Sequence, residues 1–306
     1  MKKILAALLF GVGLALSASA AHAEPLKVVA SFTILGDLTK QVGGEDVKVT
    51  TLVGPDGDAH VFQPTPNDAK ALKEADVIVV NGLGFEGWIN RLIKTSGTKA
   101  VVVTASKGIA KTLTMAEEEE KGHHHHHHGS TDPHAWQNIA NGRVYVKNIA
   151  AALQKADTPN SQKYRERAEK LDAELAALDA WVKKEIATVP VEKRRVITTH
   201  DAFGYFADAY QVKFLAPTGF STEDEPSAKE MKQLIGQINS GKIRALFFEN
   251  MSNPNVIKQL ATETGAVVGP ALYADALSGA EGNAPTYQAM FKYNVTELVK
   301  AMGRNE

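Results

Sequence analysis

Three isolated histidines are the residues of this chain with the clearest potential for chemistry. The sequence contains 10 histidines, of which His22 lies near the N-terminus and residues 123–128 form an uninterrupted run. His60, His134 and His200 stand apart from these and from one another. Neutral imidazole is the commonest protein ligand for zinc-like metals. Three lone imidazoles together with a histidine run therefore make transition-metal binding the leading hypothesis.

The local sequences place each lone histidine in a loop or at the end of a strand. His60 follows a Gly-Pro-Asp-Gly turn after the β-type segment 47–53, His134 lies in Asp-Pro-His-Ala-Trp, and His200 ends segment 195–199. In parallel α/β domains, the loops after the strands' carboxyl ends line the ligand crevice. A structural role explains any one of these histidines equally well. Their common position at sheet ends favours a joint role in binding.

Composition restricts the ligands that a metal site can use and gives no support for nucleic acid as a partner. The chain has no cysteine, so it can form no disulfide, and any metal site must use nitrogen and oxygen ligands only. The formal net charge is −1, which gives no support for binding to nucleic acid.

The first 23 residues have the pattern of a secretory signal peptide. Lys2 and Lys3 precede an apolar run over residues 4–16, and Ala21-His22-Ala23 matches a cleavage site. The apolar run is too short to span a membrane as a helix. We therefore expect residues 1–23 to be removed and the remaining chain to be a periplasmic protein, a monomer with no direct membrane insertion.

The remainder alternates between strand and helix patterns. Expected strands cover residues 26–32, 47–53, 76–81, 99–104, 195–199, 212–215, 243–248 and 266–269. Expected helices cover residues 33–42, 67–75, 85–95, 201–210, 227–239, 255–264 and 286–302. Ser227 and Glu230 form a capping-box pattern at the start of one of them. Strands that alternate with helices predict an α/β fold with parallel sheets, here in two lobes.

A long amphipathic helix is expected between the lobes. Between Tyr164 and Val182, apolar residues recur at spacings of four and three, and Pro159 and Pro190 bound the pattern. About 28 helical residues would span roughly 40 Å, enough to run along both lobes as one rigid connection; a surface helix confined to one lobe is the alternative. The expected organisation is an N-terminal α/β lobe over residues 24–157, the connecting helix over residues 158–190, and a C-terminal α/β lobe over residues 191–306.

Residues 115–130 are of low complexity. Their sequence, MAEEEEKGHHHHHHGS, cannot build a core, so we expect a disordered, solvated loop. A native metal-collecting loop is one interpretation. An engineered insertion is the other, because six histidines followed by Gly-Ser resemble a purification tag. In both cases we expect the run to be an accessory to the lone histidines.

Several sequence elements together resemble the metal-specific solute-binding proteins of ABC importers for zinc and manganese, the cluster of TroA-like and ZnuA-like proteins. The elements are Asp58-Ala59-His60 with Pro64 and Pro66, Asp132-Pro133-His134-Ala135-Trp136, Thr199-His200-Asp201-Ala202-Phe203, residues 219–228, and Tyr273-Ala274-Asp275-Ala276-Leu277-Ser278. The Asp-Pro-His-x-Trp element and the combined order are specific, and the resemblance covers nearly all of the chain after residue 23. It implies two α/β lobes joined by one long rigid helix, with a variable His- and acid-rich insertion before Asp-Pro-His.

The resemblance also implies a ligand set. It assigns His60, His134, His200 and Asp275 as metal ligands. Glu249, near the end of an expected strand, is the other candidate carboxylate and could instead orient a ligand histidine. Three imidazoles and one carboxylate suit tetrahedral Zn(II), whereas Mn(II) prefers more oxygen ligands. Manganese importers of this cluster typically have glutamate where His200 stands, although some members with three histidines bind both metals. The absence of cysteine departs from ZnuA-like members that contain a disulfide.

The expected function is therefore a periplasmic protein that captures Zn(II) and delivers it to the permease of an ABC importer. A manganese-binding or dual-metal protein of the same transporter type is an alternative, and a surface adhesin or metal-storage protein is another. A zinc hydrolase is not expected, because the chain has no His-Glu-x-x-His sequence and Asp275 would close the fourth coordination position. Hydrolysis of activated esters by the zinc form would distinguish an enzyme, and a neighbouring permease gene would favour transport.

Overall fold

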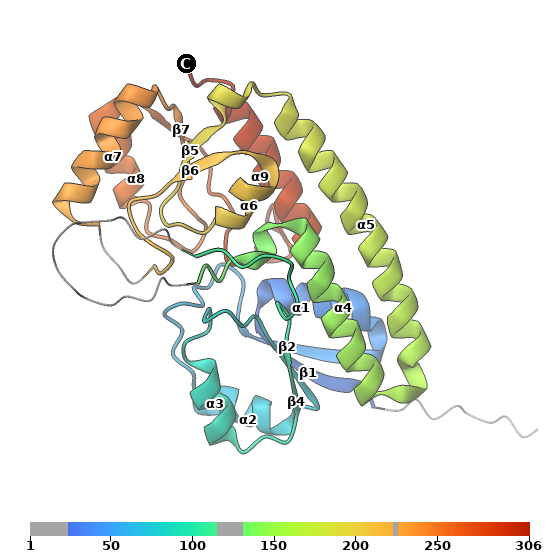
Figure 1. Ribbon diagram of the computed structural model, residues 1–306. Coiled ribbons are helices and arrows are strands. Elements are labelled where there is room, and N and C mark those ends of the chain that lie inside the picture. Colours follow the sequence, from blue (N-terminus) through green and yellow to red (C-terminus); the bar gives the residue numbers. More distant parts are fainter. Residues whose placement is uncertain (1–23, 115–130, 223–225) are drawn as a thin grey trace, which may run out of the picture.

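The chain forms two α/β lobes, one above the other, with long helices along one side (Figure 1). The computed structural model describes residues 24–114, 131–222 and 226–306. The expected signal peptide, residues 1–23, and the acid- and histidine-rich segment, residues 115–130, lie outside the described residues. No helix in the described ranges is long and apolar enough to cross a membrane.

The first lobe is built on a parallel sheet with strand order β2-β1-β3-β4. Its strands are β1 (Leu26–Phe32), β2 (Val47–Val53), β3 (Val77–Val80) and β4 (Val101–Thr104). Its helices are α1 (Thr33–Gly43), α2 (Pro66–Glu74), α3 (Ile89–Ser96) and α4 (Ile139–Ala156), with short 3-10 turns η1 (Gly44–Asp46) and η2 (Ala135–Gln137). All four residues of β3 are buried, as expected for a strand covered on both faces.

The second lobe repeats this arrangement with strand order β6-β5-β7-β8, again parallel. Its strands are β5 (Arg195–Ile197), β6 (Lys213–Leu215), β7 (Ala245–Leu246) and β8 (Val267–Val268). Its helices are α6 (Gly204–Tyr210), α7 (Ala228–Gly241), α8 (Asn255–Thr264) and α9 (Tyr287–Met302), with a 3-10 turn η4 (Val191–Lys193). The predicted fold class, two lobes with parallel sheets, is confirmed.

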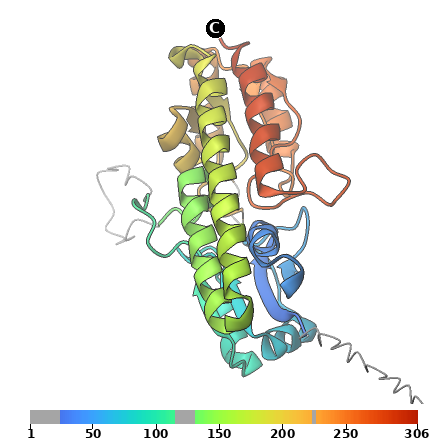
Figure 2. The same ribbon diagram turned by 90° about the vertical axis from the view of Figure 1, so that its right-hand side faces the viewer.

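Helix α5 (Ser161–Ala187) runs along both lobes. It follows the 3-10 turn η3 (Thr158–Asn160), and its 27 residues give a length of about 40 Å. The apolar residues that predicted it are buried, and it packs against α1 and α4 of the first lobe and α6 and α9 of the second. Figure 2 shows α5 passing from the lower lobe to the upper one, with α4 beside its lower half. The alternative of a helix confined to one lobe is wrong.

The hydrophobic cluster with the most buried residues extends through both lobes. The same cluster of buried side chains includes Leu38 of α1, Leu175 of α5, and Phe206 and Phe291 of the second lobe. A large apolar contact between lobes resists their separation, because opening it would expose that surface to water. The shared core therefore favours a fixed arrangement of the lobes.

Helix α4 was not expected from the sequence. Its buried face nevertheless has helical spacing, with Tyr145, Val146, Ile149 and Leu153 in contact with the core. Gly142 weakens the helix pattern at its start. This glycine is needed because a Cβ there would lie 2.5 Å from the hydroxyl oxygen of Tyr287.

Several other elements are shorter than expected. The segment expected as strand 243–248 forms only β7, and the helix expected over 201–210 begins at Gly204. His200 does not end β5 but lies three residues beyond it, in an isolated parallel bridge with Thr218. The second-lobe strands therefore stop early, and the residues after them form loops that face the first lobe.

Candidate metal centre

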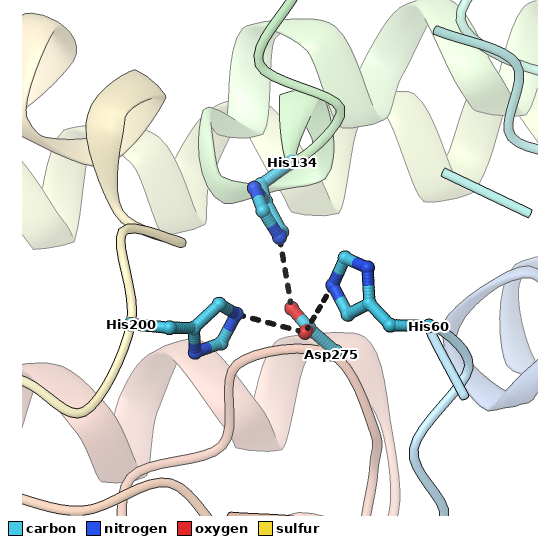
Figure 3. A group of neighbouring side chains, drawn as sticks. All are labelled: His60, His134, His200 and Asp275. Carbon is cyan, nitrogen blue, oxygen red and sulfur yellow. Dashed lines mark hydrogen bonds and ion pairs between the residues drawn. The ribbon is translucent and has the colours of Figure 1, made fainter. Parts of the chain in front are cut away.

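The three lone histidines and Asp275 meet at one point between the lobes. Figure 3 shows the imidazoles of His60, His134 and His200 around the carboxylate of Asp275, each from a different segment. One ligand atom from each residue can be chosen so that all lie within 4.8 Å of one another. The structure thus brings together all four residues that the resemblance assigns as ligands.

The distances fit a four-coordinate metal. The Nε2 atoms of His60 and His200 lie 3.3 Å and 3.1 Å from Oδ2 of Asp275, and Nε2 of His134 lies 3.7 Å from Oδ1. Bonds of 2.0–2.2 Å in a tetrahedral zinc site separate neighbouring ligand atoms by about 3.3–3.6 Å. The three nitrogen–oxygen distances lie close to this separation but involve both oxygens of Asp275, so the four groups would have to move slightly to surround an ion.

The potential ligand atoms are dry and largely without partners. The side chains of His134, His200 and Asp275 are at most 1% exposed, and that of His60 is 8% exposed. Nε2 of His60, Nε2 of His134 and Oδ1 of Asp275 are buried without any hydrogen-bond partner. Leaving buried polar atoms unpaired is unfavourable, so a bound cation would satisfy them.

His60 is held by the loop that follows β2. Its backbone N–H donates to Oδ1 of Asp58 at 2.8 Å, and the indole of Trp88 donates to the carbonyl of Ala59 at 2.8 Å. The other carboxylate oxygen of Asp58 accepts a hydrogen bond from the hydroxyl of Thr222, 2.7 Å away in the second lobe. The peptide group that joins Ala59 to His60 is therefore held at both its carbonyl and its N–H, and the loop is also linked to the opposite lobe.

His134 is held by the aspartate two residues before it. Oδ1 of Asp132 accepts the His134 backbone N–H at 2.9 Å and lies 2.8 Å from Nδ1 of the same ring. This carboxylate engages Nδ1, so Nε2 is the ring nitrogen that faces Asp275 and is the one that would bind a metal. The amide of Asn81 donates to the carbonyl of Pro133 at 2.9 Å, and so fixes the backbone next to the ligand.

His200 is held by Glu249, which lies just after β7. Oε1 of this carboxylate accepts the backbone N–H groups of Thr199 at 2.9 Å and of His200 at 3.4 Å. Oε2 lies 3.7 Å from Nδ1 of the His200 ring, and both atoms are buried without a hydrogen-bond partner. The sequence hypothesis that Glu249 orients a ligand histidine agrees with this arrangement, in which a small ring rotation would complete the hydrogen bond.

The buried carboxylates and imidazoles shift one another's pKa values. Burial alone would favour the neutral form of His200, but the Asp275 and Glu249 carboxylates outweigh it and raise the pKa of His200 well above its usual range. Burial likewise opposes the charge of Asp275, yet His134 and His200 hold the pKa of this carboxyl well below its usual range. In the metal-free protein, His200 and Asp275 therefore form an ion pair.

Asp132 and Asn81 are supporting residues that the sequence did not single out. For Asp132 a signal exists, because Asp58-Ala59-His60 and Asp132-Pro133-His134 share an Asp-x-His spacing, and in both the aspartate accepts the N–H of the histidine. Asn81 has no such signal, since it reaches Pro133 across 52 residues of chain.

Comparison with known proteins extends these observations. The profile of the family described as zinc-uptake complex component A, periplasmic, matches residues 28–301. The chain is 31% identical to the iron-binding protein YfeA of Yersinia pestis, over 92% of this chain and 88% of that protein. It is 30% identical to the manganese-binding lipoprotein MntA of Bacillus subtilis, over 94% of this chain and 92% of that protein.

Solved structures agree with the sequence matches. The periplasmic zinc-binding protein TroA of Treponema pallidum superposes with a TM-score of 0.83 at 30% identity, over 92% of this chain and all of that one. The similarity thus includes both lobes and the long helix. The chain belongs to the family of zinc-uptake complex component A, which consists of metal-binding solute-binding proteins of ABC importers and not of enzymes.

Proposed function

We propose that this protein captures Zn(II) in the periplasm and delivers it, as a monomer, to the permease of an ABC importer. The observation that supports this most is the convergence of three imidazole nitrogens and one carboxylate oxygen, within 4.8 Å of one another, in a buried site. In this proposal His60, His134, His200 and Asp275 are the ligands, and residues 1–23 are the export signal. Zinc accepts such a nitrogen-rich, four-coordinate set readily.

Manganese is the second candidate, and the relatives support it. MntA of Bacillus subtilis is named as manganese-binding and YfeA of Yersinia pestis as iron-binding, at nearly equal identity to this chain. Against manganese, only one of the four converging residues is a carboxylate, and a hard, six-coordinate ion prefers more oxygen. The donor set therefore favours zinc over the metals for which these relatives are named.

Metal analysis of the purified protein, followed by competition between zinc and manganese, tests which of the two metals the site prefers. We expect protein lacking residues 123–128 to bind one zinc ion tightly, and a 100-fold excess of manganese not to displace it. Such a preference follows from the nitrogen-rich ligands and from the general order of metal affinities, in which Zn(II) binds well above Mn(II). Displacement of zinc by comparable manganese concentrations would contradict the zinc assignment, and absence of any tight metal would contradict the site.

Metal binding should leave the lobes where they are. Because α5 and a common core connect the two lobes, we expect solution scattering to give nearly the same radius of gyration with and without zinc. Zinc should act locally, by ordering the loops around His60, His134, His200 and Asp275. A decrease of several ångströms, as in solute-binding proteins that close about a hinge, would contradict the rigid connection.

A further inference from the structure

One backbone carbonyl beside the metal centre accepts two side-chain hydrogen bonds from the opposite lobe. The carbonyl oxygen of Ala274 lies 2.9 Å from Nε1 of Trp136 and 2.8 Å from Nε2 of Gln137. Ala274 immediately precedes Asp275, and the two donors belong to η2, which immediately follows His134. All three of these residues are fully buried. Both lone pairs of this carbonyl are therefore used by the segment that contains His134.

These two bonds fix Asp275 relative to His134 without any metal. The Ala274 carbonyl belongs to the peptide group that also contains the backbone nitrogen of Asp275, and this group is planar. Holding the oxygen at two points fixes the plane from which the Asp275 side chain starts. On the other side, Asp132 and Asn81 hold the His134 backbone. Two ligands from different lobes are thus joined through a short and rigid path.

The two donors differ in what else they do. Trp136 fills the core of the first lobe, with its ring 5.0 Å from that of Phe32 and 4.7 Å from that of Phe85. Its loss would disturb packing as well as the hydrogen bond. Gln137 has no aromatic ring to pack in this way, and its amide donates to the carbonyl of the residue that precedes Asp275. Gln137 is therefore the donor whose contribution to the metal site can be separated from its contribution to the core.

We propose that Gln137 is a positioning residue of the metal centre, which holds the Asp275 carboxylate against His134 through the Ala274 carbonyl and so favours a four-coordinate ion. The proposal rests on the proposed function, because it assumes that Asp275 and His134 are ligands. A carboxylate fixed in this place keeps a constant geometry toward the three imidazoles, which suits a small four-coordinate ion. A loosened carboxylate can rotate, offer both oxygens, and accommodate a larger ion with more ligands.

Cobalt provides a probe of this geometry, because tetrahedral Co(II) absorbs visible light much more strongly than six-coordinate Co(II). The test uses the protein from which only residues 123–128 have been removed. There we expect Gln137→Leu to weaken the cobalt absorption and to lower zinc affinity about tenfold, as the loss of a residue that supports a metal ligand typically does. Manganese affinity should fall by less, so the ratio of zinc affinity to manganese affinity should decrease.

The chain offers a matched control on the same interface between lobes. Gln288 of α9 and Gln41 of α1 exchange two amide hydrogen bonds at 2.7 Å and 2.9 Å. Gln288→Leu removes a similar contact between lobes, but the Gln288 amide bonds to Gln41 and not to the backbone beside any of the four proposed ligands. Cobalt absorption and zinc affinity should therefore stay at wild-type values. If Gln137→Leu also leaves both unchanged, or if both variants lower only the melting temperature, Gln137 is merely structural and the proposal is wrong.

A second variant covers the case in which Gln137→Leu does not fold. Gln137→Asn keeps a buried amide but shortens its reach by one methylene, so it should fold and still lose the bond to Ala274. An unchanged cobalt spectrum in Gln137→Asn would overturn the proposal. If the wild-type protein itself gives no tetrahedral cobalt spectrum, the proposed ligand set is at fault, which is a different outcome from failure of the Gln137 variants alone.

Discussion

Replacing His134 or His200 with alanine is expected to lower the affinity for zinc by at least about 100-fold. Loss of an outer partner of a metal ligand already weakens binding 10- to 100-fold, so loss of the ligand itself should reach or exceed the upper end. Both side chains are almost completely buried, and alanine would leave Asp275 facing an empty space in a dry site. For His60→Ala we expect a smaller loss, of at least about tenfold, because its partly exposed position admits water as a substitute ligand.

The measurement is a zinc titration against a competing chelator, in protein lacking residues 123–128 so that the run contributes no ligands. Gln63→Ala is the matched control, because Gln63 is exposed on the same loop as His60, three residues further along. This control should bind zinc as tightly as the wild-type protein. Unchanged affinity and stoichiometry in all three histidine variants would show that the metal binds elsewhere.

Local sequence patterns predicted much of the fold. The strand over residues 26–32 and the helix over residues 255–264 were predicted with their exact ends, and the capping box of α7 forms between Ser227 and Glu230 as expected. These features depend on neighbouring residues, through alternation, helical spacing and capping. The early ends of β5 and β7 could not be predicted in this way, because the loops after them are held by contacts with the other lobe and with distant strands.

Sequence patterns also predicted part of the candidate site. The three histidines stand out because they are rare, and a shared position at strand ends follows from the parallel topology. Asp275 does not stand out among 35 acidic residues and came only from the family resemblance. The residues around the ligands were harder still. Glu249 was proposed from its place near the end of an expected strand, but Asn81 and Gln137 act on residues 52 and 137 positions away in sequence, and no local pattern records such contacts.

Zinc affinity is expected to fall with decreasing pH, beginning above pH 6.5. Unperturbed imidazoles, with pKa values of about 6.5, would compete with zinc mainly below about pH 6. In the folded metal-free protein the Asp275 and Glu249 carboxylates, opposing the effect of burial, raise the pKa of His200 well above its usual range. His200 therefore holds a proton at neutral pH that zinc must displace. Affinity should drop about tenfold per pH unit while one proton is displaced.

The ion pair between His200 and Asp275 also makes the stability of the metal-free protein depend on pH. The raised pKa of His200 stabilises the metal-free fold fully below about pH 6.5, and this contribution is lost as the pH rises through the folded-state pKa. The lowered pKa of Asp275 stabilises the fold above its ordinary value and loses that effect as the pH falls through the folded-state pKa. The metal-free protein should thus lose stability at alkaline pH while zinc binds more tightly, so the increase in melting temperature caused by zinc should be larger at pH 8 than at pH 6.5.

Calorimetric titration in buffers of different ionisation enthalpy counts the protons released, and we expect release at pH 7.5. Glu249→Gln keeps the shape of the side chain but removes one of the charges that raise the pKa of His200, so fewer protons should be released and the loss of affinity should begin at lower pH. Glu263→Gln, an exposed change on α8, should leave both unchanged. The prediction is contradicted if zinc affinity is constant from pH 6.5 to pH 8 and no proton is released at pH 7.5. His200 would then be neutral in the metal-free protein, or would not be the residue from which zinc displaces a proton.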